Sequence, residues 1–305
     1  MKNSPYFLKS KLLLKILPLI RPEDNFALKG GTALNFFVQN LPRLSVDIDL
    51  TYLPIEERAV TLSNISKSME NIEKRVKNFL PGAVINKKLL GANINKMAVL
   101  LDNQEVKIEP NTIIRGSVFE SVSLKLCEQA VNIFETDLSI KCLQKEELYA
   151  GKICAALDRQ HPRDLFDVKL FLDNEGFSEK TRKAFLVYLI SHNRPIIELL
   201  DPACLDISKL YNQEFRDMTI VNIPIEELIE ARSNLISSIR STLTDSDKEF
   251  LLSFKQGKPN WSLLGVSGID LLPAVKWKLS NINKMGEEKH LLAFNKLNNF
   301  FNNLK

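Results

Sequence analysis

The sequence has no uncharged apolar run near the roughly 20 residues that a membrane-spanning helix requires. It has only four cysteines and three histidines. No two cysteines form a Cys-x-x-Cys pair, and no histidine lies beside them in ligand spacing. These features argue against a membrane protein and a cysteine-based zinc site. The start of the chain does not resemble a signal peptide, because Lys15 and Pro18 interrupt its apolar stretch. We therefore expect a cytoplasmic protein with four buried thiols.

The charge of the chain is nearly balanced, with a net charge of +4 over 305 residues. Residues 251–305, however, carry eight lysines against three acidic residues. A basic C-terminal end suits an anionic partner such as RNA, although a solvated lysine face explains it equally well. With 45% hydrophobic residues, the chain can form two domains or one elaborated domain.

The hydrophobic pattern predicts an α+β region followed by a mainly helical one. We place the boundary near residue 176, so that residues 1–176 form the first domain and residues 177–305 the second. Thr32 is expected to cap the second helix of the first domain. The predicted helices of that domain cover residues 5–20, 32–40, 54–80, 127–134, 144–159 and 163–172, and the predicted strands cover residues 26–28, 44–53, 83–90, 94–101, 105–109, 118–124 and 138–143.

One predicted strand carries the strongest functional signal. In residues 44–53, Ser45, Asp47 and Asp49 alternate with large apolar residues. Because side chains at i and i+2 project from the same face of a strand, Asp47 and Asp49 can bind the same divalent ion. An ordinary solvent-facing strand is the alternative, but aspartate is depleted in strands.

A glycine-rich turn, Gly30-Gly31-Thr32, precedes this strand and lies between a predicted strand and a predicted helix. Backbone N–H groups at such a turn bind phosphate, and glycines let the chain approach it closely. Mg²⁺, or Mn²⁺ in its place, takes a few carboxylate oxygens and keeps its other positions for water and phosphate. The turn and the acid pair together predict an NTP site with the metal on Asp47 and Asp49. Ser45 would contact phosphate or position a ligand.

A third carboxylate on a neighbouring strand would complete the metal site, and Glu109 is the candidate. Lys107 shares its face by the period of two. In this role Glu109 would bind metal and act as general base, or orient the attacking hydroxyl. The alternative is a solvated pair on an edge strand.

These residues resemble the motifs of the AbiEii/AbiGii toxin family, the MenT-type nucleotidyltransferases of the DNA polymerase β superfamily. The resemblance covers about residues 27–170, and the later helical part has no matching motif. It rests on Lys29-Gly30-Gly31-Thr32-Ala33-Leu34, Arg43-x-Ser45-x-Asp47-x-Asp49-Leu50, Lys107-Ile108-Glu109, and Glu147-Leu148-x-x-Gly151-Lys152-x-x-Ala155 continuing to Arg159 and Pro162-Arg163-Asp164-Leu165-Phe166-Asp167.

The resemblance implies a polymerase β-like nucleotidyltransferase core with a mixed sheet. It also implies a toxin that transfers nucleotides from NTP, with the 3′ acceptor end of tRNA as the expected target. A cognate antitoxin, often a winged-helix transcriptional regulator, would accompany it.

The last motif can be interpreted from its spacing. Lys152 and Arg159 lie two turns apart on the helix predicted for residues 144–159, on one side of its apolar stripe. Two cations there can bind a triphosphate, Lys152 as a point charge and Arg159 as a fork. Asp164 would be the partner of Lys152 or a direct site acid. The alternative is a salt-bridge network, including Asp167, that ties two helices together.

We therefore predict an NTP-dependent nucleotidyltransferase that acts on an RNA 3′-hydroxyl. Two alternatives stay open at this point. The same core could transfer the nucleotide to a protein hydroxyl. The chain could also be a catalytically silent module that binds RNA or a partner through its basic end.

Overall fold

The computed structural model of the protein describes residues 4–304. The chain forms two compact units. The first contains the chain up to Leu148 together with Arg216–Asn222, and the second contains Tyr149–Phe215 and the chain from Ile223 onward. The boundary between the two units lies within helix α5 (Lys145–Asp158). The next helix, α6 (Pro162–Asn174), packs against α10 (Ile225–Thr242) in the second unit. The assignment of functional domains to residues 1–176 and 177–305 stays a prediction.

The first unit is built on one seven-stranded sheet with the strand order β3-β4-β5-β2-β1-β7-β6. Strands β1 and β2 pair antiparallel, whereas β1 with β7 and β2 with β5 pair parallel. This mixed sheet confirms the predicted α+β class. The strands are β1 Phe26–Lys29, β2 Asp47–Tyr52, β3 Val84–Leu90, β4 Asn93–Leu101, β5 Gln104–Asn111, β6 Val122–Lys125 and β7 Ser139–Cys142.

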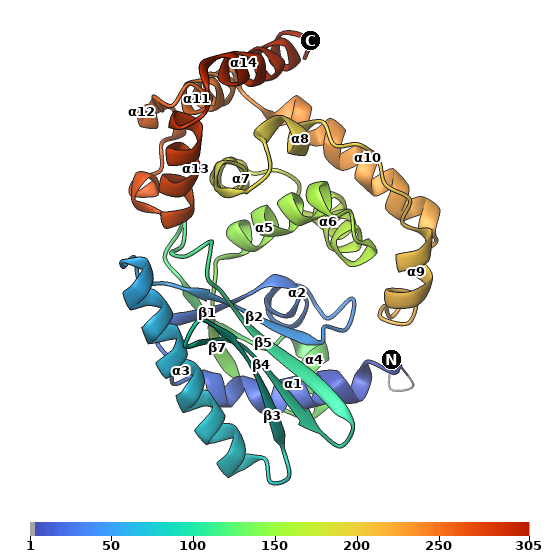
Figure 1. Ribbon diagram of the computed structural model, residues 1–305. Helices are drawn as coiled ribbons and strands as arrows, with labels where there is room; N and C mark the ends of the chain where they lie inside the picture. Colours follow the sequence, from blue (N-terminus) through green and yellow to red (C-terminus); the bar gives the residue numbers. More distant parts are fainter. Residues whose placement is uncertain (1–3, 305) are drawn as a thin grey trace. The chain divides into compact units, whose positions relative to one another are not determined.

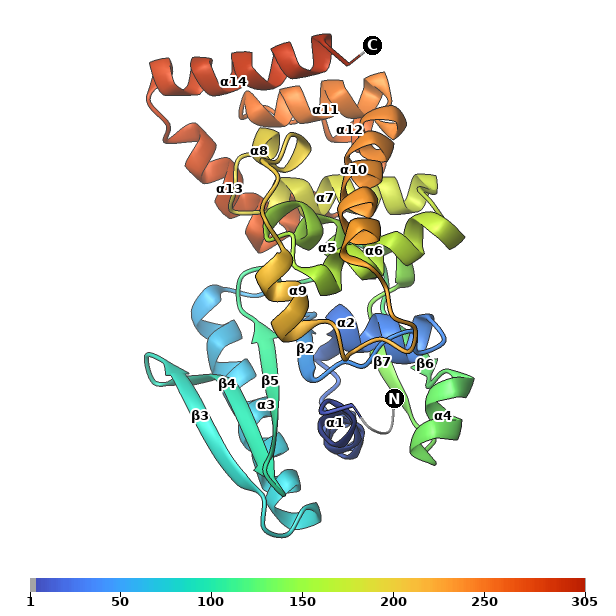
Figure 2. The same cartoon turned by 90° about the vertical axis from the view of Figure 1, so that its right-hand side faces the viewer.

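Helices α1 (Phe7–Ile20) and α3 (Arg58–Phe79) pack on one face of this sheet (Figure 1). Ile65, Met69 and Ile72 of α3 recur at helical spacing and are fully buried. Figure 2 shows α3 beside β3, β4 and β5, which form one edge of the sheet. The covered face is therefore apolar, and the polar positions of β2, β4 and β5 lie on the other face.

The chain between β1 and β2 departs from the prediction. The helix here begins at Gly30 as α2 (Gly30–Ala33), continues as a π-helix over Leu34–Val38, and is not capped by Thr32. Strand β2 begins at Asp47 rather than at residue 44, because residues 42–44 hydrogen-bond residues 218–220 instead of a neighbouring strand. The remaining helix of the first unit is α4 (Glu128–Phe134).

The second unit is helical, in agreement with the predicted pattern. Phe185, Phe250 and Phe254 are among its fully buried side chains. Nowhere within residues 4–304 is a helix both long enough and apolar enough to cross a membrane. Besides α5, α6 and α10, its helices are α7 Glu179–Ser191, α8 Ile196–Leu200, α9 Ser208–Glu214, α11 Asp245–Lys255, α12 Trp261–Leu264, a 3₁₀ turn at Ile269–Leu271, α13 Pro273–Asn283 and α14 Glu287–Asn302.

The four cysteines are all free thiols, but they are not all buried. Cys142 and Cys154 are buried, Cys127 is half-buried and Cys204 is exposed. Burial raises the pKa of the Cys142 thiol to about 12. The expectation of four buried thiols is therefore wrong, because Cys204 lies in an exposed stretch before α9 rather than on an apolar face.

Candidate functional site

Strand β2 carries the two predicted metal ligands on one face. Asp47 and Asp49 are both half-buried, whereas Ile48 between them is fully buried on the helix-covered face. In the parallel ladder with β5, Asp47 pairs with Lys107 and Asp49 pairs with Glu109. The structure therefore places both acids on the polar face of the sheet, at adjacent positions of that face.

The glycine turn packs directly against the segment that carries these acids. Gly30 has a φ of +70°, and a Cβ added there would overlap Asp49 Oδ2. A Cβ added to Gly31 would lie only 2.7 Å from Arg43 Nη2 and 3.2 Å from Ser45 Oγ. Both glycines are thus required by close approach, and at Gly30 by the left-handed backbone as well.

Thr32 connects the turn to the acid strand through its hydroxyl. Thr32 Oγ1 donates a hydrogen bond to the Asp47 carbonyl oxygen (2.6 Å) and lies 2.9 Å from Ser45 Oγ. Its prediction as a helix cap is wrong, because the hydroxyl is used across the fold and the helix starts two residues earlier. Ser45 is buried just before β2, and its hydroxyl contacts the Thr32 hydroxyl and lies close to Gly31.

Arg43 places a buried cation at the glycine turn, which strand alternation alone did not reveal. It is only 2% exposed, and its Nη1 donates to the Leu44 carbonyl oxygen at 2.9 Å. The Leu44 N–H in turn donates to the Met218 carbonyl oxygen, so a distant segment holds this stretch in place. The only signal in the sequence was the position of Arg43 two residues before Ser45 in the family motif. Its guanidinium adds positive charge beside a turn where phosphate is expected.

Glu109 lies on the same face but has a cationic partner of its own. Its Oε1 is 3.0 Å from Lys96 Nζ, and the two side chains are 31% and 45% exposed. In the part of the chain that the structure describes, no three His, Cys, Asp or Glu side chains are arranged to hold a metal ion. The structure thus does not gather Glu109, Asp47 and Asp49 into a three-carboxylate cluster. The role of Glu109 stays a prediction.

The residues present nevertheless fit a nucleotide-bound magnesium ion. Mg²⁺ is commonly held by one or two carboxylates together with substrate phosphates and water. Asp47 and Asp49 supply two carboxylates on one half-exposed strand face, and Asp49 Oδ2 fills the space left open by the missing side chain of Gly30. This donor set suits a metal that arrives with a phosphate ligand.

The second predicted group forms a buried ion-pair cluster in the second unit. Lys152 Nζ lies 2.8 Å from Asp164 Oδ1 and 2.9 Å from Asp167 Oδ2, and both aspartates are fully buried. Arg159 Nε lies 2.6 Å from Asp164 Oδ2, although the Arg159 side chain is 59% exposed. The network between α5 and α6 that the sequence left as an alternative is therefore present. Its binding of a triphosphate stays a prediction.

The charges in this cluster determine the ionisation of Asp164. Burial alone would raise the pKa of this carboxyl. Lys152 and Arg159 outweigh burial and hold the pKa of Asp164 well below its usual range. Asp164 is therefore a carboxylate at neutral pH. Its complete burial against Lys152 and Arg159 agrees with a partner of Lys152, and its role toward substrate stays a prediction.

Two other motif residues have structural contacts. His161 is the N-cap of α6, where its Nδ1 accepts a hydrogen bond from the Arg163 N–H at 3.1 Å and its Nε2 faces Glu214. Burial and the neighbouring Arg163 lower the pKa of His161. Glu147 is buried, and both of its carboxylate oxygens accept from the Val118 N–H at 3.0 Å. These contacts explain both residues without a catalytic role.

Comparison with known proteins adds a family to this geometry. A family model described as nucleotidyl transferase AbiEii toxin, type IV TA system, matches residues 11–281. Among solved structures, the chain is similar to MenT4, a nucleotidyltransferase toxin from Mycobacterium tuberculosis H37Rv. That match has a TM-score of 0.56 and 13% identity and covers 90% of this chain and 92% of that one. JHP933 from Helicobacter pylori matches with a TM-score of 0.44 and 16% identity, over 78% and 95% of the two chains. No curated protein matches the sequence.

Proposed function

Since the chain belongs to the nucleotidyl transferase AbiEii toxin family of type IV toxin–antitoxin systems, we propose that it transfers a nucleotide from an NTP to the 3′-hydroxyl of RNA. The acceptor end of tRNA is the proposed target. One observation carries this proposal. Asp47 and Asp49 lie half-buried on one face of β2, and Gly30 packs against the Asp49 carboxylate.

In this reaction the acceptor 3′-oxygen attacks the α-phosphorus of the NTP. A new P–O bond forms, the bond from the α-phosphorus to the pyrophosphate oxygen breaks, and the hydroxyl proton is lost to a base. Asp47 and Asp49 would hold Mg²⁺ or Mn²⁺, which supplies charge neutralisation for the phosphates when bound. The two carboxylates thereby fix where the α-phosphate can lie.

The glycine turn would bind the phosphates of the NTP through its backbone N–H groups. Gly30 and Gly31 let the chain approach the ligand, and the Arg43 guanidinium lies close enough to add charge there. Thr32 and Ser45 would hold this turn against β2 through their hydroxyls. These contacts would not select one NTP, because they reach the phosphates, which all NTPs share.

Glu109 is proposed to accept the proton of the attacking hydroxyl or to orient that hydroxyl. Its register position beside Asp49 supports this role, and its exposed fraction leaves it accessible. In the resting protein its carboxylate lies 3.0 Å from the Lys96 ammonium. A metal contact from Glu109 would need the carboxylate to turn from Lys96.

In the second unit, Lys152 and Arg159 are proposed to bind the triphosphate. The exposure of Arg159 supports a contact with ligand, because its guanidinium can exchange Asp164 for phosphate. Lys152 is more enclosed, and Asp164 and Asp167 fix the position of its ammonium group. Asp164 therefore acts through Lys152 in this proposal.

The family also implies an antitoxin, and we propose that a winged-helix regulator is the cognate partner. The cytoplasm is the proposed place of action, because NTPs and tRNA are found together there. Co-expression with a candidate winged-helix antitoxin and rescue of growth would test the partner.

The activity is tested by incubating the purified protein with each labelled NTP, Mg²⁺ and total tRNA. We expect label on RNA with the native chain, and none with Asp47→Asn. Asp24→Asn is the matched control, because the Asp24 side chain is 94% exposed in the same unit and should keep full activity.

The other outcomes decide between the alternatives. Label that migrates with protein would assign a protein hydroxyl as the acceptor. Absence of label with all four NTPs would exclude transfer to tRNA. Growth inhibition that survives Asp47→Asn would favour a catalytically silent binding module.

A further inference from the structure

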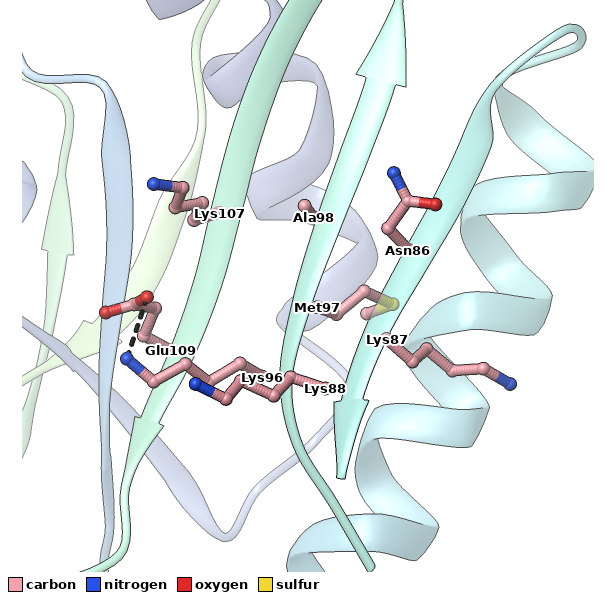
Figure 3. A pocket seen from close by; sticks show the side chains of 8 residues that line it. All are labelled: Asn86, Lys87, Lys88, Lys96, Met97, Ala98, Lys107 and Glu109. Carbon is pink, nitrogen blue, oxygen red and sulfur yellow. Dashed lines mark hydrogen bonds and ion pairs between the residues drawn. The ribbon is translucent and has the colours of Figure 1, made fainter. Parts of the chain in front are cut away.

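A lysine-lined pocket lies on the polar face of the sheet, across strands β3, β4 and β5 (Figure 3). Its volume is about 330 Å³. Four of its eight lining residues are lysines and only one is acidic, so its lining carries a net positive charge. The lining residues are Asn86, Lys87, Lys88, Lys96, Met97, Ala98, Lys107 and Glu109.

The strand register joins this pocket to the acid pair. Lys88 of β3 pairs with Lys96 of β4. On β5, Lys107 pairs with Asp47, and the next position of that face brings Glu109 beside Asp49. The lysines and the proposed metal ligands therefore share one sheet face, in neighbouring strands of one unit.

The lysines of the pocket differ in what they contact. Lys88 and Lys107 are exposed, and within residues 4–304 neither forms an ion pair. Lys96 is paired with Glu109 at 3.0 Å. Lys87 extends away from the other lysines in Figure 3, and its Nζ lies 3.0 Å from Glu73 on α3. The charge available to a ligand therefore comes mainly from Lys88 and Lys107.

The order of strands decides which substrate the pocket can serve. Strand β2 lies between β1, which leads into the glycine turn, and β5, which borders the pocket. In nucleotidyl transfer the attacking and leaving oxygens lie on opposite sides of the phosphorus. If the glycine turn holds the leaving pyrophosphate, the acceptor must approach the metal site from the β5 side.

We infer that Lys88, Lys96 and Lys107 bind the backbone phosphates of the RNA acceptor next to its 3′ end. This inference rests on the proposed function and assigns a separate surface to the acceptor. Lysine ammonium groups bind phosphate as point charges. Lys88 and Lys107 lie two strands apart, about 10 Å by the usual strand spacing, so together they can contact more than one phosphate. A protein acceptor has no comparable row of phosphates next to its hydroxyl, so the lysines favour RNA.

The test compares Lys88→Ala/Lys107→Ala with the native chain, using total tRNA and labelled NTP. We expect the double variant to raise the KM for tRNA roughly tenfold, with the KM for NTP and the kcat at saturating tRNA within twofold of native values. In filter binding, the slope of log K against log salt should fall in magnitude by about 1.4, or about 0.7 for each lysine that contacts a single strand.

Lys77→Ala is the matched control, because it also removes an exposed lysine of the first unit, but one on α3 that pairs with Glu73 and does not line the pocket. It should leave the KM for tRNA unchanged. Thermal melting of all variants should coincide with that of the native chain, since the substituted ammonium groups are exposed.

The outcomes separate this inference from the proposed function. If the native chain labels tRNA and the double variant shows an unchanged KM for tRNA, the pocket assignment is overturned and the activity stands. A raised KM for NTP instead would assign the pocket to the nucleotide and overturn the assignment to the acceptor. If the native chain labels protein or nothing, the proposed function and this inference both fall.

Discussion

Two pairs of aspartates come from the family motifs, and the fold treats them in opposite ways. Asp47 and Asp49 are half-buried on a strand face. Asp164 and Asp167 are fully buried, and both contact Lys152. A buried carboxylate must be paired with a cation, whereas a half-exposed one can accept a metal or a substrate. Substitutions in the first pair should therefore impair catalysis, and substitutions in the second should impair stability.

The largest expected effect is the loss of catalysis on substitution of Asp47, and it tests the catalytic half of this comparison. Asp47→Asn should lower kcat about 1000-fold or more, because it removes one of the two β2 carboxylates proposed to hold the metal. The melting temperature should change little, since Asp47 is half-buried. Single-turnover kinetics and thermal denaturation measure the two quantities. A large drop in stability with residual activity would break the comparison.

Asp164→Asn should act on stability instead. Loss of this carboxylate leaves the buried Lys152 ammonium with one acidic partner, and we expect the free energy of unfolding to fall by about 3 kcal/mol. Urea denaturation measures it. Asp173→Asn is the control on the same helix, because the half-exposed Asp173 pairs with Lys169 at the surface and should cost less than about 1 kcal/mol.

The same variant has a defined pH dependence. The pKa of Asp164 is lowered in the folded protein, so its contribution to stability is present above the unfolded pKa of about 3.9 and is lost as pH falls toward the folded pKa. The difference in unfolding free energy between the native chain and Asp164→Asn should be constant from pH 7 to about pH 5 and shrink below about pH 4. A difference that stays constant to pH 3 would contradict the pairing.

Glu109 shares a feature with each pair of aspartates. It is partly exposed, like Asp47 and Asp49, and it forms an ion pair with a lysine, like Asp164 and Asp167. Glu109→Gln should lower kcat about 100-fold if the carboxylate takes the hydroxyl proton. Lys96→Met removes the ion-pair partner of Glu109 and one of the three lysines proposed to bind RNA, so kcat should be compared at saturating tRNA, where it should change by less than about threefold. Equal losses of kcat in the two variants would mean that activity depends on the Glu109–Lys96 ion pair and not on the carboxylate as a base.

The smallest effect separates backbone strain from close approach. Gly30→Ala and Gly91→Ala both place alanine at positive φ, +70° and +63°, and each should cost about 1 kcal/mol of stability. Only at Gly30 does the new Cβ displace the Asp49 carboxylate, whereas the space at Gly91 is open. We expect Gly30→Ala alone to lose activity, by roughly 20-fold in kcat/KM.

Much of the fold could be predicted because its signals are local. The meander β3-β4-β5 and the helices α1, α3 and α6 follow from alternation, helical spacing and turn residues, and their bounds differ from the prediction by a few residues. The errors occur where long-range contacts override local preference. Strand β2 is shortened by residues 218–220, and the Thr32 hydroxyl binds Asp47 instead of capping a helix.

The sequence by itself determined that Asp47 and Asp49 share a strand face and that glycines precede them, because spacing along one strand is a property of the local chain. Only the tertiary structure decided what surrounds them. It placed the Arg43 guanidinium at Gly31, paired Glu109 with Lys96, and assembled three strands into one lysine-lined pocket. These contacts join residues far apart in the chain, and no local period specifies them.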